Sequence, residues 1–153
     1  MTLLFAFLIG LFAGLRSFTA PAVTAWAAYL GWLKLERPLS LIASLPAVVI
    51  LTVFAIGELF VDKHPKAPNR TDAMGVIARI LTGGLTGACV ATAGGEGAII
   101  GAVLGAVGGV VGCFTGFQVR TRLVKAFGTR DIYIALIEDI VAIGGSLWVV
   151  SRF

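Results

Sequence analysis

The chain carries the uncharged, glycine-rich stretch GAIIGAVLGAVGGVVGCFTGF at residues 97–117. An α-helix needs about 20 mostly apolar residues to cross the hydrocarbon core of a bilayer, and this stretch has that length. Glycines recur along it at four-residue spacing, at Gly97, Gly101, Gly105 and Gly109, and are followed by Gly112 and Gly116. One face of the helix is therefore nearly bare backbone, against which another helix must pack closely. We expect a glycine-zipper spanning helix here.

The rest of the chain has the same apolar character. Its 153 residues are 58% hydrophobic and only 13% charged, with a mean hydropathy of +0.99, whereas about a quarter of the residues of soluble domains are charged. Further apolar stretches lie at residues 3–33, 39–61, 73–93 and 132–150. The sequence thus excludes a water-soluble fold and predicts an all-α integral membrane protein. We expect one polytopic transmembrane domain over residues 1–153, a bundle of about five helices.

The first apolar stretch allows two interpretations. Arg16 and Pro21 interrupt it, and a proline inside a helix removes a backbone donor and can kink the helix. We expect one long, bent span over residues 3–33. The alternative is a break at residues 16–21, which gives two short membrane-entering helices like the discontinuous helices of some transporters. No Lys or Arg precedes the stretch, so we do not expect a cleaved signal peptide.

Basic residues are distributed unevenly over the loops. With five spans, one side of the membrane receives Lys63, Lys66, Arg70, Arg120, Arg122, Lys125 and Arg130, and the other receives Lys34, Arg37 and Arg152. Loops rich in Lys and Arg stay in the cytoplasm, so we expect the N-terminus inside. Trp26, Tyr29, Trp32 and Trp148 would then form an aromatic belt on the outer side.

Five charged side chains fall within the apolar stretches, namely Arg16, Glu58, Arg79, Glu138 and Asp139. An ionised group near the bilayer centre costs at least about 2.5–3.5 kcal/mol, so these side chains should face protein or water. We expect the acidic pair of the last span to meet Arg79. Three carboxylates against two guanidiniums would leave one acidic group free to carry a titrating proton. The functional interpretation is a proton or cation site on a transport path, and the structural one is an ion-pair network that joins the spans.

The basic loop residues are candidates for contact with anionic lipid or phosphate. They are Lys63, His64, Lys66, Arg70, Arg120, Arg122 and Lys125. For residues 62–70 we favour the simpler interpretation of a turn that only sets the orientation. Residues 120–127 alternate basic and apolar side chains, which predicts a short interfacial helix ending near Gly128. Membrane lipids are the partners that we expect.

Several functional classes lack a signature in this sequence. The glycine-rich stretch lacks the Gly-Lys-Ser/Thr end of a nucleotide-binding loop, and the single histidine, His64, cannot form a metal site or catalytic dyad alone. We expect no enzymatic activity, metal, cofactor or nucleic-acid partner. Arg16 and Arg79 both begin an Arg-x-x-Thr pattern, which suggests an internal duplication.

Three segments carry a resemblance to a known family. They are residues 14–19, with the sequence GLRSFT, Asp62-Lys63 with Pro65, Pro68, Asn69 and Arg70, and residues 136–139, with the sequence LIED. In these segments the chain resembles a bacterial membrane family named domain of unknown function 4126. The resemblance implies a small polytopic protein of the bacterial cytoplasmic (inner) membrane, but no substrate, cofactor or catalytic residue.

Two functions fit these observations. The first is a small transporter or channel-like protein, working as a homo-oligomer, that moves a proton, cation or small solute through the intramembrane Arg/Glu/Asp site. The alternative is a membrane scaffold or assembly factor whose charges and glycines serve helix packing alone. An enzyme acting on lipid is a third class, for which no nucleophile and base or metal constellation is present.

Overall fold

The computed structural model describes residues 1–64, 66 and 71–153, and these residues are all-helical, without strands. Three helices are long and apolar enough to cross a membrane, judged by length and composition: α4 (Ala73–Ala93), α5 (Ala98–Phe127) and α6 (Asp131–Val150). Two shorter apolar helices are α1 (Thr2–Leu15) and α3 (Leu45–Val61). α2 (Thr19–Tyr29) and the short 3-10 helix η1 (Leu39–Ala43) complete the described elements. The fold is compatible with a helical membrane protein.

The glycines of α5 pack against two other helices of the same chain. A Cβ atom added to Gly105 would lie 2.1 Å from the carbonyl oxygen of Gly83 in α4. On the other side, a Cβ added to Gly10 of α1 would lie 2.1 Å from the carbonyl oxygen of Gly105. Backbone therefore touches backbone on both sides, which only glycine permits, and α1, α4 and α5 form the tightly packed centre of the bundle.

The first apolar stretch forms a hairpin of two short helices, and not the one bent span that we expected. α1 runs parallel to α5, because Gly10 meets Gly105 and Gly14 meets Gly109. α2 runs back along α3, because the Ser17 amide lies at Glu58 and the Trp26 indole lies at Thr52. At 14 and 11 residues the two helices are each shorter than a bilayer crossing requires.

The chain reverses direction at residues 16–18. Arg16 leaves the helix with extended backbone (φ −140°, ψ 114°), and Pro21 falls in the first turn of α2. A proline is tolerated there because the first backbone N–H groups of a helix have no intrahelical partner. Pro21 thus belongs to the start of a second helix and does not kink a single one.

Two other predicted segments differ from the structure. The stretch 39–61 divides at Ser44, whose hydroxyl accepts a hydrogen bond from the Ala47 amide (3.4 Å) and caps α3. Residues 120–127 do not form a separate interfacial helix, because they continue α5 without a break to its end at Gly128 (φ +59°). The two Arg-x-x-Thr patterns also lie in different settings, since Arg16 ends a helix whereas Arg79 lies within α4.

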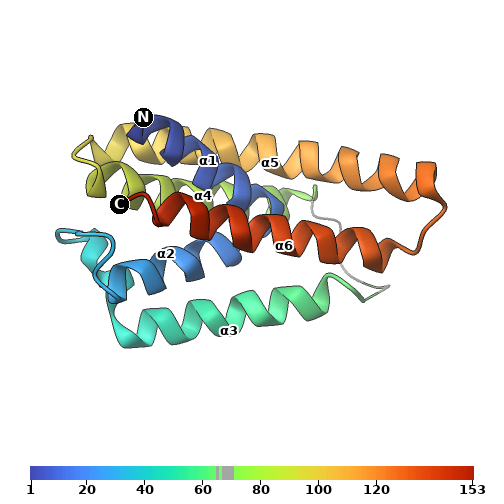
Figure 1. Cartoon of the computed structure of the whole chain (residues 1–153), viewed down its shortest axis with the longest axis horizontal. Coiled ribbons are helices and arrows are strands. Elements are labelled where there is room, and N and C mark those ends of the chain that lie inside the picture. The colour runs from blue at the N-terminus through green and yellow to red at the C-terminus, as the bar shows by residue number, and fades with distance from the viewer. Residues whose placement is uncertain (65, 67–70) are drawn as a thin grey trace.

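Both chain termini lie at the same end of the molecule (Figure 1). Here the rings of Phe5 and Phe153 approach edge to face, 5.8 Å apart, and Phe5 also contacts Trp148. We call this the terminal end. The opposite end, which we call the basic end, holds Lys63 after α3 and the loop between α5 and α6.

Candidate functional site

Charged side chains from two neighbouring helices complete the backbone hydrogen bonding at the reversal between α1 and α2. The carboxylate of Glu58, on α3, accepts hydrogen bonds from the backbone amides of Ser17 (2.7 Å) and Phe18 (2.9 Å). The guanidinium of Arg79, on α4, donates to the carbonyl oxygen of Gly14 (2.9 Å). The negative carboxylate of Glu58 thus lies at the positive N-terminal end of α2, and the positive guanidinium of Arg79 lies at the negative C-terminal end of α1. The helix dipoles favour both placements.

Arg16 lies at the reversal itself and is completely buried. Its guanidinium forms ion pairs with Asp62, just after α3, and with Asp139, on α6. Asp139 is shared with Lys63, whose ammonium lies 2.9 Å from the second carboxylate oxygen. The hairpin tip is therefore joined by charge to the last helix and to the end of α3.

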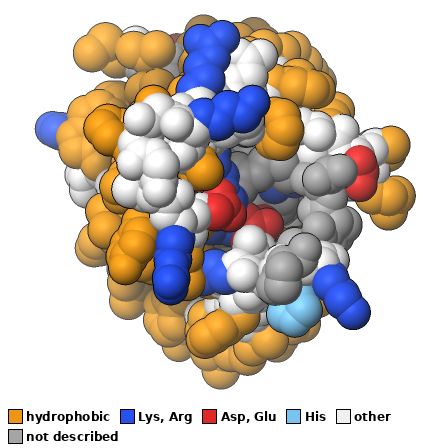
Figure 2. Space-filling model, turned by 90° about the vertical axis from the view of Figure 1, so that its right-hand side faces the viewer, with side chains coloured by type: hydrophobic (Ala, Val, Ile, Leu, Met, Phe, Trp, Pro, Cys, Tyr) orange, Lys and Arg blue, Asp and Glu red, His pale blue; other side chains and the backbone are white. Residues whose placement is uncertain are grey.

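Arg120 of α5 extends this group of charges. Its guanidinium lies 3.4 Å from Asp62 and 3.5 Å from Glu138, and its Nε donates to the exposed Asp131 at 2.8 Å. The six inner members form what we call the ion-pair cluster: Arg16, Asp62, Lys63, Arg120, Glu138 and Asp139. Figure 2 shows acidic side chains recessed among Lys and Arg side chains at the basic end.

The structure brings together only part of the predicted site. Asp139 pairs with Arg16 and Lys63, not with Arg79 as we expected. Glu58 and Arg79 instead bind backbone groups at the hairpin. Among the described residues, the cluster holds three cations and three carboxylates.

Sequence reasoning missed Asp62 and gave Lys63 and Arg120 a different role. Asp62 and Lys63 were expected in a loop and Arg120 in a short interfacial helix, and the two cations were assigned to lipid contact, yet the structure gives each a protein partner. Residue depth gives no signal for these pairs, because Asp62 and Lys63 follow the end of the expected second span whereas Glu138 and Asp139 lie inside the last one.

The other predicted lipid contacts lie at the basic end. Arg122 and Lys125 are exposed on the last turns of α5, and the His64 ring accepts a hydrogen bond from the Lys66 amide at 3.3 Å. Arg70 lies outside the described residues. Within the described residues, no group of three or more His, Cys, Asp or Glu side chains could hold a metal ion.

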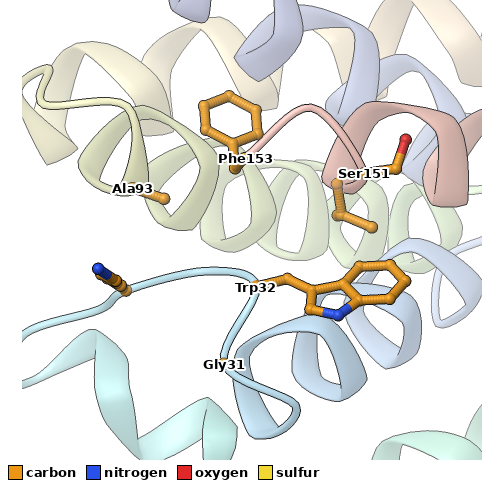
Figure 3. Close-up of a pocket in the computed structure, with 7 residues that line it drawn as sticks. Gly31, Trp32, Ala93, Ser151 and Phe153 are labelled. Atoms are coloured by element: carbon orange, nitrogen blue, oxygen red, sulfur yellow. The ribbon is translucent and has the colours of Figure 1, made fainter.

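Two hollows lie at opposite ends of the molecule. At the terminal end, Trp32, Lys34 and Phe153 line a pocket of about 480 Å³ (Figure 3). At the basic end, an apolar crevice of about 180 Å³ lies between α5 and α6, with Arg120 and Glu138 in its wall. The ion-pair cluster therefore borders the second hollow.

The comparisons with known proteins agree with the resemblance carried by the hairpin tip and the acidic pair. No curated protein matches the chain, and no solved structure matches it. The model of the family described as domain of unknown function (DUF4126) matches residues 3–151, which is nearly the whole chain. The chain thus belongs to the family of domain of unknown function 4126.

Proposed function

We propose that this protein is a small transporter or channel-like protein that moves a proton, a cation or a small solute, with the ion-pair cluster as its site. The observation that carries the proposal is the completely buried Arg16, paired with Asp139 at the tip of two half-length helices. Discontinuous helices whose ends point at a buried charged site are a recurring arrangement in secondary transporters. Intramembrane ionisable groups are themselves candidates for ion or proton pathways.

The arrangement places Asp139 between two cations. Its carboxylate forms an ion pair with Arg16 and accepts a hydrogen bond from Lys63. A transported cation that competes for this carboxylate would weaken its ion pair with Arg16. Cation binding would thus loosen the hairpin tip from α6.

We also propose that the basic end faces the cytoplasm of a bacterial cell, in its inner membrane. Lys63, Lys66, Arg120, Arg122, Lys125 and Arg130 belong to this end, whereas Lys34, Arg37 and Arg152 belong to the terminal end. The positive-inside rule thus assigns to the cytoplasm the same loops that the sequence analysis placed there. Because the hairpin returns the chain to the terminal end, this orientation places the N-terminus outside the cell. A single first span would have placed it inside.

Flux through purified protein in liposomes tests the transport proposal. Imposed proton, Na⁺ or K⁺ gradients should collapse faster with wild-type protein, and Asp139→Asn should abolish the flux while the protein stays folded. Glu96→Gln is the control, because Glu96 is an exposed carboxylate in the turn between α4 and α5, away from the cluster, and it should retain flux. Equal flux in the two variants would remove Asp139 from the mechanism, and no flux of any ion in the wild type would contradict ion transport.

The contacts of Glu58 and Arg79 favour the alternative, a non-transporting membrane scaffold or assembly factor; either protein would work as a homo-oligomer. Glu58 and Arg79 bind backbone groups at the hairpin. In this alternative, the charges and a glycine zipper in α5 serve helix packing alone. In that case Asp139→Asn should lower thermal stability or dissociate the oligomer, with no wild-type flux to lose. Size-exclusion chromatography with light scattering, run beside the flux assay, separates the two functions.

A further inference from the structure

The crevice between α5 and α6 is almost wholly apolar. Its lining includes Val119 and Leu123 of α5 and Ile137 and Val141 of α6, and among the described residues the charged groups in its wall are Arg120 and Glu138. These two charges lie 3.5 Å apart and offset each other. Since α6 begins at Asp131, Ile137 lies about 9 Å into the helix, at 1.5 Å per residue. The crevice is therefore at the depth of the upper acyl chains when the end of α5 is at headgroup level.

Exposed cations lie just beyond the crevice. Arg122 and Lys125 are on the last turns of α5, and Arg130 directly precedes α6; we call these three residues the basic rim. All three are exposed, and no ion pair between described residues joins any of them to a carboxylate. The basic rim thus carries positive charge that the protein leaves uncompensated.

We propose that the crevice and the basic rim bind one anionic phospholipid, with an acyl chain in the crevice and the phosphate at the rim. The crevice volume of about 180 Å³ equals about six water volumes of roughly 30 Å³ each, yet its lining offers water few partners. A hydrocarbon segment suits that lining, and a negative headgroup suits the rim.

Charge also favours a lipid over a second copy of the chain. A two-fold contact brings the same surface of both copies together. Contact through this crevice would set one basic rim against another, and like charges would repel. An anionic lipid brings the opposite charge to the basic rim. This lipid site goes beyond the transport proposal and does not depend on it.

Native mass spectrometry of the purified protein with dioleoyl phosphatidylglycerol or dioleoyl phosphatidylcholine tests the site. The rim variant Arg122→Gln/Lys125→Gln/Arg130→Gln should retain phosphatidylglycerol more weakly, by about fivefold for each cation removed, with phosphatidylcholine unaffected. Its control, Lys34→Gln/Arg37→Gln/Arg152→Gln, removes three cations from the terminal end and should bind as the wild type does.

A second pair of variants tests the crevice. Ile137→Trp should fill it and weaken retention of both lipids, whereas Ile140→Trp should not, because Ile140 does not line it. Both side chains are more than half exposed, so the fold should tolerate both changes. Equal lipid binding within either pair of variant and control would overturn the proposal. A dimer that Ile137→Trp dissociates in lipid-free detergent would also overturn it, by making a second copy the occupant.

Discussion

At the scale of single residues, the structure explains why Glu58 and Arg79 lie inside apolar segments. A helix that breaks within a membrane leaves carbonyl groups unpaired on one side of the break and amides unpaired on the other, and lipid cannot satisfy either. Glu58 accepts from two of these amides, and Arg79 donates to one of these carbonyls. Both charges thus stabilise the reversal.

Removing the carboxylate of Glu58 should therefore destabilise the hairpin. Glu58→Ala leaves two amides without an acceptor, at roughly 1–3 kcal/mol each, so we expect a loss of about 2–6 kcal/mol. Glu58→Gln keeps one acceptor oxygen and should lose about half as much. Thermal unfolding in detergent, with Glu96→Ala in an exposed turn as the control, measures the difference. The same stability for the two alanine variants would mean that Glu58 does not cap α2.

The pair of Arg16 and Asp139 should show strong energetic coupling. Replacing one member of a buried ion pair typically costs about 3–5 kcal/mol, because the other charge stays buried without its partner. We expect Arg16→Met and Asp139→Leu each to destabilise the protein by that amount. The double variant should lose at least about 1 kcal/mol less than the sum of the two single losses. Strict additivity in a double-mutant cycle would show that the two side chains do not interact.

At the scale of helices, the close approach of α5 to α1 and α4 makes particular glycines irreplaceable. A Cβ at Gly105 would meet backbone at 2.1 Å, while a Cβ at Gly144 of α6 meets nothing within 4 Å. Gly105→Ala should destabilise the protein by about 1–3 kcal/mol or more, because backbone must move to admit the methyl group. Gly144→Ala should stabilise it by roughly 0.5–1 kcal/mol through helix propensity. Equal melting temperatures for the two variants would contradict the packing of α5.

The helices could be predicted from sequence where the signal is local, but the hairpin could not. α4 occupies the residues expected for the third span, because length and apolar composition are properties of the segment itself. The reversal at Arg16 depends on Glu58 and Arg79, which other helices bring to it. The sequence reveals such charges but not their partners. We therefore expected Arg79 to pair with Asp139, whereas in the structure Arg16 forms that ion pair.

At the scale of the molecule, the hairpin fixes which chain ends share a side of the membrane. Thr2 packs against Gly94 in the turn between α4 and α5, and Lys34 and Phe153 line one pocket. Because all of these groups lie at the terminal end, the hairpin adds no net crossing. A single first span would instead separate the N-terminus from residue 34.

Cysteine labelling should show this sidedness directly. In a background in which the buried Cys89 and Cys113 are replaced by Ala, cysteines placed at Met1, Lys34 or Phe153 should react with a membrane-impermeant maleimide in intact cells. Cysteines placed at Lys66 or Lys125 should react only after permeabilisation, because the proposed orientation places the basic end in the cytoplasm. If positions 1 and 34 label from opposite sides, the hairpin is wrong. If positions 1, 34 and 153 label together but only after permeabilisation, the hairpin holds and the proposed orientation is reversed.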